Sequence, residues 1–303
     1  MTSVLYDVPG PRAVRRNRII GIATVLLVLV VLGFIAWRFY ITGQFSAEKW
    51  YIFTFSNVWL SFGKATLATV LAFVAAAVGA LIVGFALAIA RLSDHAWVRL
   101  PAAAITEVFR AVPVLILMML LYYGLPVIGI ELGSYLSVVI ALVVYNGSVL
   151  AEVLRAGIES LPRGQSEAGY SVGLRKSGVM QLVLLPQAVR AMMPVIIAQL
   201  VVTLKDTALG FIITYPELLK FAKLIGSNAQ YGSPLIPAAM VAGVIYVSMC
   251  LLLSYSAYRV QQRLSSQAGT ATSTAAPFQE GTDTELIVAQ RDRQKSDYNT
   301  GAD

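Results

Sequence analysis

Two adjoining charged residues are the clearest candidates for chemistry in this sequence. Lys205 and Asp206 lie inside a long apolar run, and Thr207 follows them directly. A charged side chain at the centre of a membrane costs about 2.5–3.5 kcal/mol on insertion scales, so such residues usually face the interior of a helix bundle and serve a function. The three residues are therefore predicted to contact a polar solute, with an internal ion pair or an orientation toward the outer surface as the alternative.

A second candidate is Asn146, near the middle of another apolar run. Its amide needs a partner at that depth, which could be a substrate or a neighbouring helix, and both possibilities stay open. Lys64 lies near the end of its run and is expected to extend its ammonium group to the surface. Glu152 and Arg155 are three residues apart, so an ion pair along one helix face is predicted.

The sequence contains no recognisable motif for catalysis or metal binding. No G-x-x-x-x-G-K-[ST] phosphate-binding motif and no Ser/His/Asp set occurs, and the single cysteine, Cys250, lies in an apolar run. The single histidine, His95, lies in a polar stretch. We therefore expect no enzyme, no metal and no cofactor in this chain, and any ATP-Mg that powers it should be bound by a separate ATPase subunit.

The composition predicts an all-α, polytopic membrane protein. Hydrophobic residues make up 57% of the 303 residues and charged residues only 13%, whereas soluble domains carry about 25% charged residues. A membrane-spanning helix needs about 20 apolar residues. Six such spans are predicted, with the third interrupted by Arg110 and Pro113, at approximately 19–41, 59–90, 104–125, 134–157, 189–213 and 235–258.

Alternation of these spans places most lysine and arginine residues on one side. Residues 1–18, 91–103 and 158–188 share that side, whereas the connection 126–133 on the other side has neither. The positive-inside rule assigns the charged side, with both termini, to the cytoplasm of a cell-membrane protein. The +7 net charge therefore gives no reason to expect nucleic acid as a partner. Residues 265–303 are polar and are predicted to form a disordered cytoplasmic tail.

The segment 161–187 is the longest polar stretch in the middle of the chain. Ser166 is predicted to cap a short helix that begins near Glu167 and continues toward Val179, because a serine hydroxyl can accept a backbone N–H at a helix start. Gly173 marks a tight turn or a close approach of another backbone. Leu184-Leu185-Pro186 is expected to end the segment.

This segment resembles the E-A-A---G---------I-L-P loop of permeases in the ATP-binding-cassette (ABC) importers, with Gly169 in place of the usual Ala and Leu184 in place of Ile. Further elements are similar to those of the polar amino acid permeases of that superfamily. They are Glu107-Val-Phe-Arg110-Ala-Val-Pro113, Tyr145-Asn146-Gly147-Ser148, Ala151-Glu152-Val-Leu-Arg155-Ala156-Gly157-Ile158 and Leu204-Lys205-Asp206-Thr207-Ala208-Leu209. The order and spacing of these elements match over roughly residues 58–260.

The resemblance implies a five-helix importer core of type I at 58–260, with the helix at 19–41 packed outside it in the lipid. It implies that the loop 161–187 forms a coupling helix that docks on ATPase subunits. The coupling residues would then be Arg163, Gln165, Glu167, Ala168, Gly173 and Leu174.

Further implied partners are a second permease subunit, the same or different in sequence, and an extracytoplasmic substrate-binding protein. Within the family the chain looks most similar to permeases of actinobacterial glutamate uptake systems, so the expected substrate is an amino acid, L-glutamate, with glutamine also compatible. The rival interpretation is a stand-alone secondary transporter or channel for a small polar solute.

Overall fold

The computed structural model describes residues 10–269, and these residues are helical with no β-strand among them. The ends of the predicted N-terminal segment and tail, residues 1–9 and 270–303, lie outside the described residues. The helices that concern the site are α1 (Pro11–Ile41), α3 (Ser56–Arg91), α4 (Ala96–Ala111), α5 (Val114–Met119), α6 (Gly133–Glu159), α7 (Arg163–Ser171), α8 (Lys176–Gly178), α9 (Leu185–Asp206), α10 (Leu218–Gly226) and α11 (Leu235–Gly269).

Five helices are long and apolar enough to cross a membrane, and a bent pair makes a sixth candidate. That pair is Ala96–Ala111 with Val114–Ile128, and its axes meet at 97°. Pro113 lies at the bend, where its ring and its missing N–H prevent the helix from continuing. The all-α, six-span prediction is confirmed in this form, with the third span broken at the predicted proline rather than straight.

The boundaries of two predicted elements were wrong. Residues 96–103 were expected in a polar loop but form the first half of α4, which has an amphipathic sequence. The fifth span was expected to begin near residue 189, but one helical stretch runs over Lys176–Ile213 and passes through a π-helical segment at Val179–Leu184. Pro186 therefore does not end the polar segment. It lies inside this helical stretch, where the π-helical segment passes into α9.

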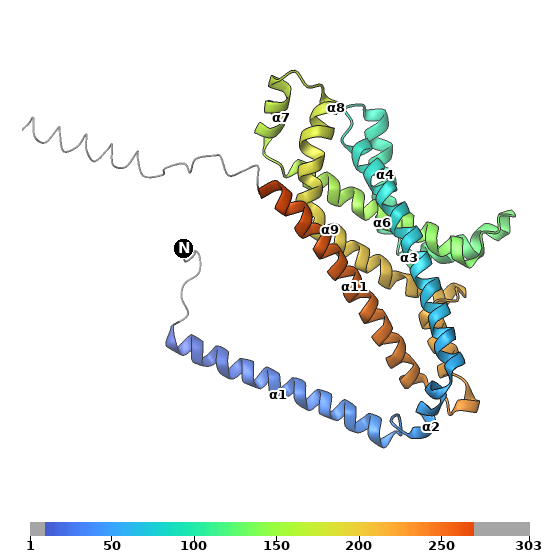
Figure 1. Cartoon of the computed structure of the whole chain (residues 1–303). Helices are drawn as coiled ribbons and strands as arrows, with labels where there is room; N and C mark the ends of the chain where they lie inside the picture. Colours follow the sequence, from blue (N-terminus) through green and yellow to red (C-terminus); the bar gives the residue numbers. More distant parts are fainter. Residues whose placement is uncertain (1–9, 270–303) are drawn as a thin grey trace, which may run out of the picture. The chain divides into compact units, whose positions relative to one another are not determined.

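The core of the described structure is the packing of α3 against α6 (Figure 1). On α3 the buried face is made of small residues, among them Ala72, Ala76 and Ala80, each with no exposed surface. A Cβ on Gly84 would lie 2.9 Å from the Leu150 Cβ of α6. Small residues let the two backbones approach closely, which is how helices gain packing energy in membranes.

Helix α1 has none of its residues buried. Its most apolar window has a mean hydropathy of 3.0, the highest of the candidate spans among the described residues. A helix that is apolar on all sides is stable only in an apolar environment, and in a membrane protein that environment is lipid or another subunit. The described part of the segment that follows Ser256, residues 257–269, continues as helix.

Candidate functional site

The first candidate site is the α7 segment, residues 161–187, which connects α6 to α9. Helix α7 ends at Ser171, and Gly173, two residues further on, lies in the left-handed region at φ +82°. The Gly173 N–H donates to the Tyr170 carbonyl at 2.9 Å, and the Leu174 N–H donates to the Gly169 carbonyl at 3.2 Å. These two bonds form the Schellman motif, in which a glycine just past the helix end lets the chain reverse and satisfies the last carbonyls. The tight turn predicted at Gly173 is confirmed.

Ser166 does not cap this helix, contrary to the prediction. Helix α7 begins three residues earlier, at Arg163, with Pro162 at the cap position and no capping side chain. The Ser166 hydroxyl instead donates back to the Arg163 carbonyl at 2.7 Å. Pro162 sets the entry angle because its fixed φ suits the residue before a helix. The helix also ends at Ser171 instead of continuing to Val179.

Most of the predicted coupling residues lie on the surface of α7. Arg163, Gln165, Glu167 and Ala168 are exposed, and Leu174 is half-buried at the turn. Two apolar side chains accompany them, Tyr170 and Val172, which are 48% and 75% exposed. The exposed candidate positions of the segment are Arg163, Gln165, Glu167, Ala168, Tyr170, Val172 and Gly173. An exposed mixture of apolar and charged side chains on a short helix is typical of a docking surface.

Gly169 has a structural reason for its departure from the usual Ala. It is buried, and a Cβ added there would lie 2.9 Å from Cγ2 of Val179. Val179 is itself 1% exposed, so it has little room to move. An alanine at position 169 would therefore fit only if Val179 moved.

The α7 segment is fixed to the connection between α3 and α4. The Lys176 ammonium group donates to the Leu92 carbonyl at 3.2 Å and pairs with the Asp94 carboxylate. The hydrogen bond from Lys176 is the main reason that the pKa of Asp94 lies below its usual value. Figure 1 shows α7 and α8 at the same end of the bundle as the start of α4. The segment is thus held on a second element and not only by its own chain ends.

An ion network lies at the ends of α3, α4 and α6. Glu152 is its centre: its carboxylate lies 2.7 Å from Arg91 of α3, 2.6 Å from Arg155 of its own helix and 3.7 Å from Arg110 of α4. Arg155 also pairs with Glu159 at 2.5 Å. The predicted Glu152–Arg155 pair is confirmed. Arg91 and Arg110 make it an interhelical junction, which spacing along one helix could not reveal.

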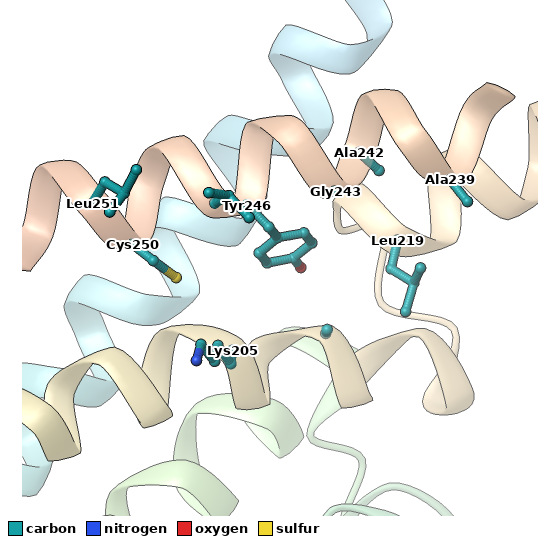
Figure 2. Close-up of a pocket in the computed structure, with 10 residues that line it drawn as sticks. Lys205, Leu219, Ala239, Ala242, Gly243, Tyr246, Cys250 and Leu251 are labelled. Atoms are coloured by element: carbon teal, nitrogen blue, oxygen red, sulfur yellow. The ribbon is translucent and has the colours of Figure 1, made fainter. Parts of the chain in front are cut away.

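The second candidate site is Lys205, near the end of α9 that is distant from α7. Lys205 is exposed and lines a cavity of about 480 Å³ between α9 and α11. Figure 2 shows Tyr246 and Cys250 projecting from α11 toward α9, with Leu219 of α10 at the edge. Among residues 10–269, no acidic group pairs with Lys205, and Asp206 is half-buried without an ion pair. The alternative of a mutual Lys205–Asp206 ion pair therefore does not occur in this structure.

Asn146 and Thr207 do not line this cavity and have no exposed surface. The Asn146 amide donates to the Leu142 carbonyl at 3.0 Å and accepts from Gln199 of α9 at 2.7 Å. The Thr207 hydroxyl donates to the Leu204 carbonyl at 2.6 Å. In this conformation Asn146 links two helices, which is one of the two roles that the sequence left open.

Glu217 was not singled out from the sequence, although it is fully buried. It caps α10: its two carboxylate oxygens accept from the Leu219 and Lys220 N–H groups, and the Tyr246 hydroxyl of α11 donates to it at 2.7 Å. Glutamate is an uncommon N-cap residue, so its position before an apolar run gives only a weak signal. The carboxylate also needs Tyr246, which lies 29 residues later in the chain.

Similarity to known proteins covers the same part of the chain. Residues 80–266 match the family described as binding-protein-dependent transport system inner membrane component. The chain is 39% identical over 227 residues to the glutamate transport system permease protein GluD of Corynebacterium glutamicum, an alignment that covers 73% of this chain and 82% of GluD. It is 34% identical over 161 residues to the probable glutamine ABC transporter permease protein GlnP of Bacillus subtilis, covering 53% of this chain and 74% of GlnP.

A solved structure of an amino acid ABC transporter with histidines superposes with a TM-score of 0.61 and 27% identity, over 67% of this chain and 94% of that one. The family match covers more than half of the chain, and it includes the α7 segment, the Glu152 network and Lys205. It is a family of transport components and not of enzymes. The chain therefore belongs to the family of binding-protein-dependent transport system inner membrane components.

Proposed function

We propose that this chain is the permease subunit of an ATP-driven importer whose substrate is L-glutamate. The observation that carries this proposal is the 39% identity to GluD, which extends over 82% of that protein. Membership of the family makes the chain a multi-pass membrane protein and makes a stand-alone secondary transporter or channel the weaker interpretation. Glutamine remains the nearest alternative substrate, since GlnP of B. subtilis is also similar.

The α7 segment is proposed to dock on the ATPase subunit. Arg163, Gln165, Glu167 and Ala168 would contact the partner, and Gly173 with Leu174 would hold the helix at the required angle. The exposure of Tyr170 and Val172 supports this role, because apolar side chains on a polar segment gain free energy when a partner covers them. ATP-Mg would bind to that partner, since the chain carries no phosphate-binding motif of its own.

Lys205 and Asp206 are proposed to contact the substrate, because they bring one cation and one potential anion to the same depth. An amino acid presents both an ammonium and a carboxylate, so a pathway needs groups of both signs. Asn146 and Thr207 would support this region through their helix–helix and backbone hydrogen bonds.

The proposed assembly has two permease chains, two ATPase chains, an extracytoplasmic binding protein and surrounding lipid, with the second permease either identical or different in sequence. Both termini and the α7 segment would be cytoplasmic, and α1 would lie in the lipid outside the core at 58–260. A reporter fused after Pro126 should score as external and one fused after Ser265 as cytoplasmic. The reverse pattern would refute this orientation.

The test of function is ATP-dependent uptake of labelled L-glutamate by a strain that lacks this chain. Wild type should restore uptake, and Lys205→Ala should lower it by about tenfold or more, as expected for the loss of a charge-assisted hydrogen bond. Lys49→Ala is the matched control, because the Lys49 ammonium group donates to the Gln44 side chain at 3.2 Å and does not line the Lys205 cavity. Unchanged uptake in the deletion strain would refute L-glutamate as the substrate of this chain. Normal uptake by Lys205→Ala would refute the proposal that Lys205 contacts the substrate.

A further inference from the structure

Helix α10 is held rigidly at the end of the bundle opposite to the α7 segment. Glu217 caps its first turn, and Tyr246 binds that carboxylate from α11. The Leu218 N–H donates to the Thr69 hydroxyl of α3 at 3.2 Å. These contacts join α10 to two membrane helices, so the side chains on its other faces have a fixed platform. One of them, Leu219, lines the Lys205 cavity.

Two lysines of α10 line two adjoining cavities. Lys220 lines a cavity of about 370 Å³ together with Lys64 of α3. It also lines a cavity of about 710 Å³ together with Lys223. Leu224 is common to both cavities, which places them side by side. Their volumes fall within the roughly 300–1,000 Å³ of small-molecule sites.

The three lysines, Lys64, Lys220 and Lys223, form no salt bridge among residues 10–269, and the Glu217 carboxylate that caps the same helix attracts Lys220 only from a longer distance. The Lys220 ammonium donates to the Thr214 carbonyl, and that of Lys223 lies 5.2 Å from the centre of the Phe211 ring. An ammonium group has three donors, so both retain capacity for another acceptor. Cavities lined by charges of one sign concentrate ligands of the opposite sign and accelerate their arrival.

We infer that these two cavities form an outer site that binds the carboxylates of a dicarboxylic amino acid before it reaches Lys205. The inference rests on the proposed function and adds to it the residues that receive the substrate at the outer end. Two carboxylates can engage two ammonium groups at once, whereas an amide side chain cannot make the second charge-assisted bond. Helix α10 would then be the shared wall between the outer site and the Lys205 cavity.

The experiment is lysine footprinting of the assembled wild-type complex in nanodiscs of phosphatidylcholine. An amine-acylating reagent labels exposed lysines, and mass spectrometry measures the rate at each one. L-glutamate at ten times its dissociation constant should slow labelling of Lys220 and Lys223 by about tenfold, because only about a tenth of the sites stay empty. L-glutamine, the neutral analogue of the same shape, should slow it much less. Lys49 is the internal control and should not change.

Three results would overturn the inference. Labelling of Lys220 and Lys223 could be unaffected by L-glutamate. L-glutamine could protect them equally, in which case the lysines do not read the second carboxylate. Protection could appear only in nanodiscs of phosphatidylglycerol and without amino acid, in which case the site holds a lipid headgroup.

A transport measurement provides the second arm. Lys220→Met combined with Lys223→Met should lower ATP-driven uptake of L-glutamate by about tenfold, whereas Lys49→Met should leave it unchanged. Recovery of the ATPase subunit with each variant reports folding, and the wild-type footprint decides the question if the double variant fails to assemble. If the wild-type complex does not import L-glutamate, the proposed function fails. If it imports L-glutamate but the lysines are unprotected, only the outer site fails.

Discussion

Gly173 should be the position in the α7 segment where a small change has the largest effect. Its φ of +82° lies in the left-handed region, and nothing lies within 4 Å of the place where a Cβ would be. The cost of a substitution is therefore conformational and not steric crowding. An L-residue pays about 1–2 kcal/mol in this region, and a β-branched residue pays more because it is a genuine outlier there. At about 2 kcal/mol the required conformation becomes about 30-fold less populated.

The expected order of transport rates is wild type, then Gly173→Asn, Gly173→Ala and Gly173→Val. Asparagine tolerates the left-handed conformation better than other side chains, so it should retain the most activity. Gly173→Val should lose about 30-fold or more while its membrane insertion stays normal, since Gly173 is exposed and outside the core. The amount of ATPase subunit recovered with the purified permease should fall in the same order.

Gly164→Ala is the matched control for this series. Gly164 lies in the same helix, has no neighbour within 4 Å of a Cβ and has an ordinary φ, so alanine there should favour the helix slightly. Normal transport and normal ATPase recovery by Gly173→Val would refute both the capping argument and the assignment of this segment to coupling. Equal losses at Gly164→Ala and Gly173→Ala would show that added bulk, and not the turn, is what matters.

Three further predictions concern neighbouring contacts. Gly169→Ala should destabilise the complex by about 1–3 kcal/mol through overpacking against Val179, and adding Val179→Ala should recover part of that loss in a double-mutant cycle of thermal melts; purely additive effects would contradict the contact. Gln199→Leu leaves the buried Asn146 oxygen without a donor and should cost about 1–3 kcal/mol, whereas replacing both residues by leucine should cost less; an equal or larger loss in the double variant would contradict this pairing. The lowered pKa of Asp94 means that its ion pair is complete above the usual 3.8 and is lost only as pH falls through the lower folded value, so ATPase recovery should not change between pH 8 and pH 5; a midpoint inside that range would contradict it.

Much of the fold was predictable because a membrane imposes strong and local constraints. Apolar runs of about 20 residues gave the spans, and a glycine in a polar segment gave the turn at Gly173. Helix ends were less predictable: Ser166 is a good capping residue by type, yet Pro162 sets the actual start of α7. The continuous helical stretch from Lys176 was not predicted, because its first residues are polar and an apolar pattern gives no sign that they join the fifth span.

The parts of the site that depend on tertiary contacts could not be predicted. Glu152 has a partner on its own helix, which the spacing predicts, but Arg91 approaches it from 61 residues away. Glu217 is buried through a partner on α11 and through its own backbone neighbours. For such residues the sequence gives the charge, while only the packing of distant helices decides whether it is buried, paired or open to a ligand.

The close fit of α3 and α6 limits where this protein can change shape. Gly84 fits against Leu150, and a Cβ on Gly147 would lie 3.0 Å from Cγ1 of Val83, so neither helix can slide along the other without a clash. We therefore expect α3 and α6 to move together as one rigid unit. The irregular helical geometry lies elsewhere, in the π-helical turns at Leu120–Gly124 and Val179–Leu184 and in the 97° bend, and we expect deformation there. The second of these turns directly follows α8. A displacement of α7 is therefore expected to rotate α9 about this turn without bending α3 or α6.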